Sequence, residues 1–266
     1  MNKTFAEGYT RNDDGLVLFP RDSDLRALLF PSLDPTEHVA KANLHMVKAL
    51  IEFVSEPGET VLDPFAGTGT ILVGATMNRK VICIEIEEHF QEIIERSIKS
   101  MKQDVPEIEE LTTLIPGDCS KILPWSGIAN HMIFSPPWAN VLKKKSVDSY
   151  AEDWGYGDAA KYSADPHNIA NLNVFLYYQK MEQVYKKFFQ SLTPGGTMTI
   201  IIKDKMEAGK RLGLGERAFR DSLRIGFEPV EWNKWFSPGG AFSAVNRAKG
   251  QETVTDEDLI TLRRPL

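Results

Sequence analysis

Cysteine, long apolar runs and a signal-peptide core are scarce or absent in this chain of 266 residues. Its two cysteines, Cys83 and Cys119, each stand alone, which excludes a disulfide framework and a cysteine zinc cluster and indicates a reducing compartment. No apolar run approaches the roughly 18 residues that a membrane helix needs, and residues 1–15 lack an apolar signal core. We therefore expect a cytoplasmic protein with no membrane partner and no metal site.

An overall excess of positive charge is also lacking, because the formal net charge is −6. The charge is unevenly distributed along the chain. Residues 1–138 carry 12 Lys and Arg against 21 Asp and Glu, whereas residues 139–250 carry 17 against 12. A nucleic-acid surface would lie in the second, basic part, although scattered solvated lysines explain the same excess.

Apolar periodicity indicates alternating strands and helices in a chain of ordinary globular composition, with 42% hydrophobic and 26% charged residues. Helical spacing predicts helices over residues 38–53, 70–77, 88–102, 173–192 and 216–225. Apolar runs predict strands over residues 60–63, 80–87, 112–118, 131–135, 197–203, 228–236 and 241–245. This alternation predicts an α/β fold with a mostly parallel seven-stranded sheet and helices on both faces.

The same apolar periodicity predicts one large domain with two irregular segments. Residues 1–37 show no sustained periodicity and read as an N-terminal arm, which leaves residues 38–266 as the domain. Residues 139–172 are polar, with tyrosine and tryptophan among the charges, and show no regular element. Loops of that length in a compact domain are usually functional or disordered.

The stretch "VLDPFAGTGT" at residues 61–70 predicts a ligand site at the end of a strand. Ligands of doubly wound sheets bind beyond the carboxyl ends of strands, and Gly67 and Gly69 would let the backbone approach such a ligand. The turn has no Walker lysine and an incomplete phosphate fingerprint. Asp63 would repel a phosphate but attract a cationic group.

Acidic residues follow the next two strands as well. Glu85 is placed to accept hydrogen bonds from ribose hydroxyls, and Asp118 is placed to reach an adenine amino group. Together with Asp63 they specify an adenosine that carries a positive centre and no phosphates, which describes S-adenosylmethionine. Each part alone has a plainer explanation: a tight turn, one acid of an acidic run, and a turn cap.

The stretch "IFSPPWANV" at residues 133–141 stops a strand abruptly. Pro136 and Pro137 cannot donate backbone hydrogen bonds, so they end the ladder that the preceding apolar residues begin. Ser135 stands in front of them and Trp138 behind. Taken alone, this is more simply a strand end with a core aromatic than a site.

Together, "DPFAGTGT" and "SPPW" resemble the cofactor and catalytic motifs of the amino-group DNA methyltransferases, which modify cytosine N4 or adenine N6. The segment "HVAKANLHMVKALIEF" is similar to the one that packs beside the cofactor's methionine part in that family. The resemblance implies a Rossmann-like methyltransferase fold, S-adenosylmethionine as cofactor and DNA as partner. The candidate cofactor-binding residues are Lys41, Asp63, Phe65, Ala66, Gly67, Gly69, Thr70, Glu85, Ile86, Asp118 and Cys119. The candidate catalytic residues are Ser135, Pro136, Pro137 and Trp138.

The chemistry explains the second motif. An exocyclic amine is a poor nucleophile because its lone pair is conjugated into the ring, and acceptors aimed at its hydrogens favour a pyramidal nitrogen. The Pro136 carbonyl and Ser135 would supply those acceptors, and Trp138 would stack on a base flipped out of the helix. Family members with serine in the first position are similar mainly to cytosine N4 enzymes, and those with Asp or Asn mainly to adenine N6 enzymes. The resemblance therefore favours cytosine N4, with adenine N6 as the alternative. Neither cysteine follows a proline, which counts against carbon-5 methylation.

Sequence recognition is expected from residues 139–172 and from the basic loop at 204–220, because no large recognition domain follows the last predicted strands. The cofactor motif also precedes the catalytic motif in this sequence. Many members of the family that have serine before the two prolines are similar to the permuted arrangement, in which the catalytic motif comes first. The candidate nucleic-acid contacts are Lys143, Lys144, Lys145, Tyr150, Trp154, Lys205, Lys210 and Arg211. A surface loop and the charged face of a helix are the plainer explanation of the second group. Methylation of RNA or of a protein glutamine, and a non-catalytic nucleic-acid-binding subunit, are the remaining alternatives.

Overall fold

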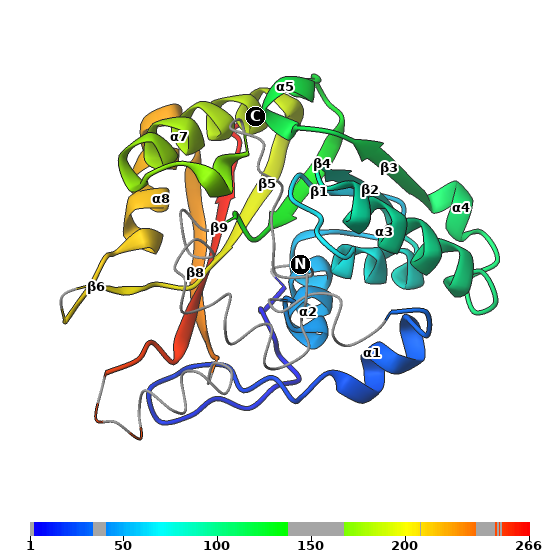
Figure 1. Cartoon of the computed structure of the whole chain (residues 1–266), viewed down its shortest axis with the longest axis horizontal. Helices are drawn as coiled ribbons and strands as arrows, with labels where there is room; N and C mark the ends of the chain where they lie inside the picture. The colour runs from blue at the N-terminus through cyan, green and yellow to red at the C-terminus, as the bar shows by residue number, and fades with distance from the viewer. Residues whose placement is uncertain are drawn as a thin grey trace.

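A seven-stranded sheet forms the centre of the computed structural model (Figure 1), with strand order β3-β2-β1-β4-β5-β9-β8. The structure describes residues 3–33, 41–137, 168–207, 209–237, 248, 250 and 252–266. The strands of the sheet are β1 (Thr60–Asp63), β2 (Lys80–Glu85), β3 (Thr112–Pro116), β4 (Ala129–Phe134), β5 (Leu192–Ile202), β8 (Glu228–Phe236) and β9 (Asp256–Arg263). The five neighbouring strands β3, β2, β1, β4 and β5 pair in parallel, in that order. Strand β9 runs antiparallel to both of its neighbours, β5 and β8. The predicted fold class is confirmed.

Helices cover both faces of this sheet (Figure 1). They are α1 (Ser23–Leu29), α2 (Leu44–Val54), the 3-10 helix η1 (Thr70–Met77), α3 (Glu88–Met101), α4 (Ile108–Leu111), α5 (Cys119–Ile122), the 3-10 turn η3 (Ile169–Asn171), α7 (Val174–Ser191) and α8 (Leu214–Ile225). A small hairpin, β6 (Met206–Glu207) with β7 (Lys210–Arg211), stands apart from the sheet. None of the helices within the described ranges is long and apolar enough to cross a membrane.

Two hydrophobic clusters, one on each face, hold the layers together. One joins α2, η1 and α3 to the sheet, and the other joins α7 and α8 to it. Adjacent residues of one strand face opposite clusters, as Val61 and Leu62 of β1 do, and both are fully buried. Strands buried on both faces read as continuous apolar runs, which is why β1, β2 and β4 stood out in the sequence.

The N-terminal residues are part of this core. The prediction of an irregular arm was wrong for Ser23–Leu29, which form α1, a helix too short to show a periodicity. Phe5, Val17 and Phe30 are almost fully buried in the cluster that contains α2. Val17 also pairs with the edge strand β8, because its N–H donates to the Lys234 carbonyl at 3.0 Å.

Several element boundaries also differ from the prediction, and β5, for example, begins at Leu192 and not at residue 197. Helix α2 begins at Leu44 and not at residue 38, because the Asn43 side chain caps it by accepting a hydrogen bond from the Met46 N–H at 3.1 Å. The seventh strand is β9, whereas residues 241–245 lie outside the described residues. The acidic residues of β9 interrupt its apolar pattern, so the sequence did not indicate a strand there. Their charges are paired with Arg211 and Lys234, which are distant in the sequence.

Gly69 is required by the fold at the start of η1. Its φ is +82°, and a Cβ added there would lie 3.0 Å from Ile94 Cγ1 and 3.1 Å from Leu72 Cδ1. We expect Gly69→Ala to lower the free energy of unfolding by about 2–4 kcal/mol, from backbone strain and crowding together. Gly58 is the matched control, because its φ is +89° and nothing lies within 4 Å of a Cβ there.

Urea denaturation of the two variants separates the two contributions. Gly58→Ala should cost about 1 kcal/mol, the strain alone. Equal losses at the two glycines would show that the packing around Gly69 is not tight.

Candidate active site

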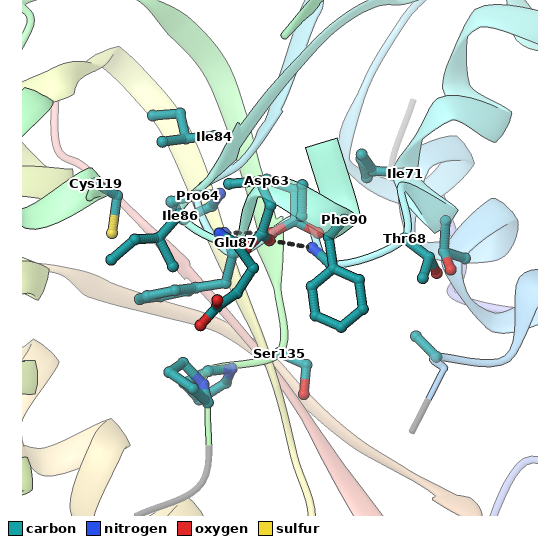
Figure 2. Close-up of a pocket in the computed structure, with 18 of the residues that line it drawn as sticks. Asp63, Pro64, Thr68, Ile71, Ile84, Ile86, Glu87, Phe90, Cys119 and Ser135 are labelled. Atoms are coloured by element: carbon teal, nitrogen blue, oxygen red, sulfur yellow. Dashed lines mark hydrogen bonds between the residues drawn. The ribbon is translucent and has the colours of Figure 1, made fainter. Parts of the chain in front are cut away.

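One pocket lies beyond the carboxyl ends of β1, β2 and β4, where α/β sheets place their ligands. Asp63 ends β1, Glu85 ends β2 and Ser135 follows β4, so one edge of the sheet brings the two sequence motifs together (Figure 2). The predicted residues that line this pocket are Lys41, Asp63, Phe65, Ala66, Gly67, Thr70, Glu85, Ile86, Asp118, Cys119, Ser135, Pro136 and Pro137. Gly69 is not among the lining residues, and Trp138 lies outside the described residues.

Glu85 holds the glycine turn in place. Its Oε2 accepts a hydrogen bond from the Gly67 N–H at 2.6 Å, and its Oε1 accepts one from the Glu87 N–H at 2.9 Å. Burial raises the pKa of Glu85 to about 7, although these backbone donors oppose the shift. A carboxylate offers about four acceptor positions, so Glu85 can still accept hydrogen bonds from a ligand.

Asp63 is the second acid of the pocket. Its Oδ1 accepts a hydrogen bond from the Phe65 N–H at 2.9 Å. Burial, together with the neighbouring Glu85 charge, raises the pKa of Asp63 to about 8, although the hydrogen bond from Phe65 opposes the shift. Two desolvated carboxyl groups in one pocket favour a cationic partner, because a positive charge would stabilise their ionised forms.

Asp118 presents a buried acceptor atom. Its Oδ1 caps α5 by accepting a hydrogen bond from the Ser120 N–H at 2.8 Å. Its Oδ2 is buried and accepts no hydrogen bond from the described residues, although the Lys121 ammonium lies 3.8 Å away. A buried acceptor of this kind fits a ligand amino group, since an unsatisfied polar atom is costly.

Aromatic and aliphatic side chains form the walls between these acids. Phe65 packs against Phe134 and Phe188, with ring centroids 5.7 Å and 6.1 Å apart. Ile86 and Phe90 line the pocket as well (Figure 2). A slot with apolar walls and a few convergent polar groups is typical of a cofactor site, and here it suits a flat, uncharged ring system.

The Ser-Pro-Pro turn lies across the same pocket. Figure 2 shows Ser135 on the opposite side of the pocket from Asp63. Strand β4 ends at Phe134, immediately before the turn, so the sheet fixes where the turn begins. A ligand held by the acids would therefore face the turn.

Glu87 and Asn168 are pocket residues that sequence reasoning missed. The Asn168 amide donates to Glu87 Oε1 at 2.7 Å, while its own oxygen accepts from the Ala170 N–H at 3.0 Å. Both side chains are only 4% exposed. Glu87 was hidden within an acidic run, but Asn168 could have been noticed as a cap before a short turn. The pair ties the chain at residue 168 to the end of β2.

The hydrogen bond between Asn168 and Glu87 leads to a prediction about ligand binding by a single and a double variant. Asn168→Asp would place two buried carboxylates about 2.7 Å apart, so we expect it to weaken binding of the pocket's ligand by about tenfold. Adding Glu87→Gln restores the pairing of one amide donor with one carboxylate, with the two groups exchanged between the positions. The double variant should therefore recover most of the affinity. Isothermal titration of both variants with the cofactor checks this, and a double variant weaker than the single one would contradict it.

The predicted nucleic-acid contacts are only partly described. Lys143, Lys144, Lys145, Tyr150 and Trp154 lie outside the described residues. Lys205 precedes the β6–β7 hairpin, and Lys210 is exposed on it.

Arg211 forms an ion pair with Asp256 within the protein. Its Nη1 donates to Asp256 Oδ2 at 2.9 Å and its Nη2 to Asp256 Oδ1 at 2.5 Å, which holds the pKa of Asp256 well below its usual range. This bidentate pair joins the hairpin to β9, while the Arg211 side chain stays 42% exposed, and its contact with phosphate stays a prediction.

Comparison with known proteins agrees with the cofactor part of this site. Residues 15–96 match the model of a DNA methylase family that covers N6 and N4 enzymes. The matched segment, which is less than a third of the chain, is similar to the amino-group DNA methyltransferases. The Type II methyltransferase M.HindIII of Haemophilus influenzae is 41% identical over 64 residues, which are 24% of this chain and 21% of that protein. The family-model match over residues 15–96 thus contains the glycine turn and Glu85 but not the Ser-Pro-Pro turn.

Solved structures extend the likeness in fold to most of the chain. The [4+2]-cyclase SpnF matches with a TM-score of 0.57 at 14% identity, covering 94% of this chain and 98% of that one. A SAM-dependent methyltransferase from Methanosarcina mazei matches with a TM-score of 0.52 at 11% identity, covering 82% and 97%. The fold is therefore the Rossmann-like methyltransferase fold. Within the ranges that the structure describes, no three His, Cys, Asp or Glu side chains gather as metal ligands.

Proposed function

We propose that this protein transfers a methyl group from S-adenosylmethionine to an exocyclic amino group of a DNA base, with cytosine N4 as the acceptor. The observation that carries the proposal is that the cofactor motif and the Ser-Pro-Pro turn line one pocket. The family of the matched segment and the fold both support S-adenosylmethionine as the cofactor. The DNA acceptor is supported by the family of a segment that covers less than a third of the chain.

The pocket residues fit this cofactor. Glu85 has acceptor positions for ribose hydroxyls, and the buried Asp118 Oδ2 fits the adenine amino group. Asp63 supplies a negative charge for a cationic centre, and Lys41 and Thr70 lie in the wall that would meet a carboxylate. When bound, the cofactor supplies an electrophilic methyl group.

The protein's own part in the reaction is to bind and orient the amino group. The hydroxyl of Ser135 and the carbonyl of Pro136 would accept hydrogen bonds from its two hydrogens, which favours a nitrogen whose lone pair points into the pocket. No nucleophilic side chain is required, because holding the two reactants in contact supplies most of the rate enhancement. A target base must leave the helix to reach the turn.

Serine before the two prolines supports cytosine N4, since family members with serine there resemble cytosine enzymes. Adenine N6 is the second candidate, because the matched family covers both acceptors. RNA methylation and a non-catalytic binding subunit remain the alternatives from the sequence.

Transfer of label from methyl-tritiated S-adenosylmethionine tests the acceptor class. The protein is incubated separately with unmodified genomic DNA, with total RNA and with a protein extract, and the retained label is counted. We expect label on DNA, and its loss in a Ser135→Ala variant that lacks the proposed hydroxyl acceptor but still binds the cofactor. Label confined to RNA or protein would overturn the DNA acceptor, and cofactor binding without transfer to any acceptor would support the non-catalytic alternative.

A further inference from the structure

Arg26 lies directly behind one wall of the cofactor pocket, although it belongs to the N-terminal helix α1. Its Nη1 donates to Thr70 Oγ1 at 3.2 Å, and its Nη2 donates to the Ala42 carbonyl at 2.7 Å. Thr70 and Ala42 both line the pocket, whereas Arg26 does not. The guanidinium therefore joins two pocket segments that are 28 residues apart in the chain.

This arginine is itself rigidly held. Asp22 Oδ2 accepts from Arg26 Nη2 at 2.6 Å and from Nε at 3.2 Å, and it also accepts from the Leu44 N–H at 2.9 Å. The Arg26 side chain is only 11% exposed. Helix α1 has no fully buried residue, and its Leu25 and Leu29 are only partly buried against the core. The polar contacts add to this packing in holding α1 against the start of α2. Figure 1 shows α1 beside α2.

The hydrogen-bond directions indicate what the wall would bind. Because Thr70 Oγ1 accepts from a guanidinium, its own hydrogen is directed elsewhere, and a cationic donor makes a hydroxyl a better donor. The bond to the Ala42 carbonyl holds the Ala42–Asn43 peptide, which directly follows Lys41 in the chain. Lys41 supplies a positive charge in the same wall. This wall suits an anionic group, because Lys41 is cationic, whereas Glu85 and Asp118 add carboxyl groups elsewhere in the lining of the same pocket.

We infer that Arg26 is a positioning residue for the carboxylate of the cofactor's amino-acid end, acting through Thr70 and the Lys41–Ala42 segment. This inference rests on the proposed use of S-adenosylmethionine. An arginine that only anchored α1 would need Asp22 and the Ala42 carbonyl alone. The third contact, to a hydroxyl of the pocket, distinguishes the two roles.

Two ligands that differ only at the amino-acid end test the inference. S-adenosylhomocysteine carries the carboxylate, and 5′-methylthioadenosine lacks the amino-acid end, while neither has a sulfonium charge. We expect Arg26→Gln to raise the dissociation constant of S-adenosylhomocysteine by about tenfold and that of methylthioadenosine by less than about twofold. Isothermal titration of the full chain measures both.

Thr70→Val supplies an independent test, because it removes the hydroxyl at nearly constant shape. It should show the same selective loss, and the double variant should lose little more than the larger single loss. If Arg26→Gln does not fold, Thr70→Val decides alone. Equal losses for the two ligands, or no loss for S-adenosylhomocysteine, would overturn the inference. A wild-type protein that binds neither ligand would overturn the proposed cofactor itself, which is a different result.

Discussion

Replacing Glu85 by alanine is expected to weaken S-adenosylmethionine binding by at least about 100-fold and to lower the free energy of unfolding by about 2–4 kcal/mol. Two backbone donors, the N–H groups of Gly67 and Glu87, would lose their acceptor inside the protein. The ligand would lose its ribose acceptor at the same time. A loss in both binding and stability is therefore the signature of this residue.

Glu88→Ala is the matched control for this prediction. Glu88 belongs to the same acidic run, but it is exposed and lies in the first turn of α3. Titration calorimetry and urea denaturation of the two variants should separate them clearly. Binding by Glu85→Ala within a few-fold of the wild type would mean that Glu85 only supports the turn.

Binding of S-adenosylmethionine is expected to strengthen by about tenfold between pH 6 and 8 and to release protons. Burial raises the pKa of Asp63 to about 8 and that of Glu85 to about 7, so the unliganded pocket holds protons near neutrality. A cationic ligand favours the ionised carboxylates and so displaces these protons. Calorimetry in buffers of different ionisation enthalpy counts them.

The same shifts predict the pH dependence of stability without ligand. Both folded-state pKa values lie above the ordinary values of 3.8 and 4.5, so the unfolded chain gives up its protons first as the pH rises. The free energy of unfolding should therefore fall between about pH 4 and 8. Asp63→Asn should flatten both trends, and the ligand's own titration is common to the two proteins. An affinity that does not change between pH 6 and 8 in the wild type would contradict the assignment of a cationic ligand to this pocket.

The sequence predicted the elements that local signals define. Strand β1 and the helix at 70–77 were placed at their observed bounds, because an apolar run is bounded by Pro-Gly on one side and a glycine turn on the other. The three acids were expected at one edge of the sheet because each follows a parallel strand, and the structure brings them into one pocket.

What the sequence could not predict depends on pairing between distant residues. Strand β9 begins with Asp256 and carries Asp258 two residues later, and their charges are matched by Arg211 and Lys234 from other elements. Arg26 meets Thr70 across 44 residues, and no periodicity marks that contact. Basic residues likewise look alike in a sequence whether they face solvent or, as Arg211 does, an internal carboxylate.

The identity of the methylated nucleoside tests the central claim most directly. Unmodified DNA is incubated with the protein and S-adenosylmethionine, digested to nucleosides and analysed by mass spectrometry. The account predicts N4-methylcytosine, absent from a parallel reaction with Glu85→Ala. N6-methyladenine would contradict the role given to Ser135 while keeping the site, and DNA without any methylated nucleoside would contradict the proposed function.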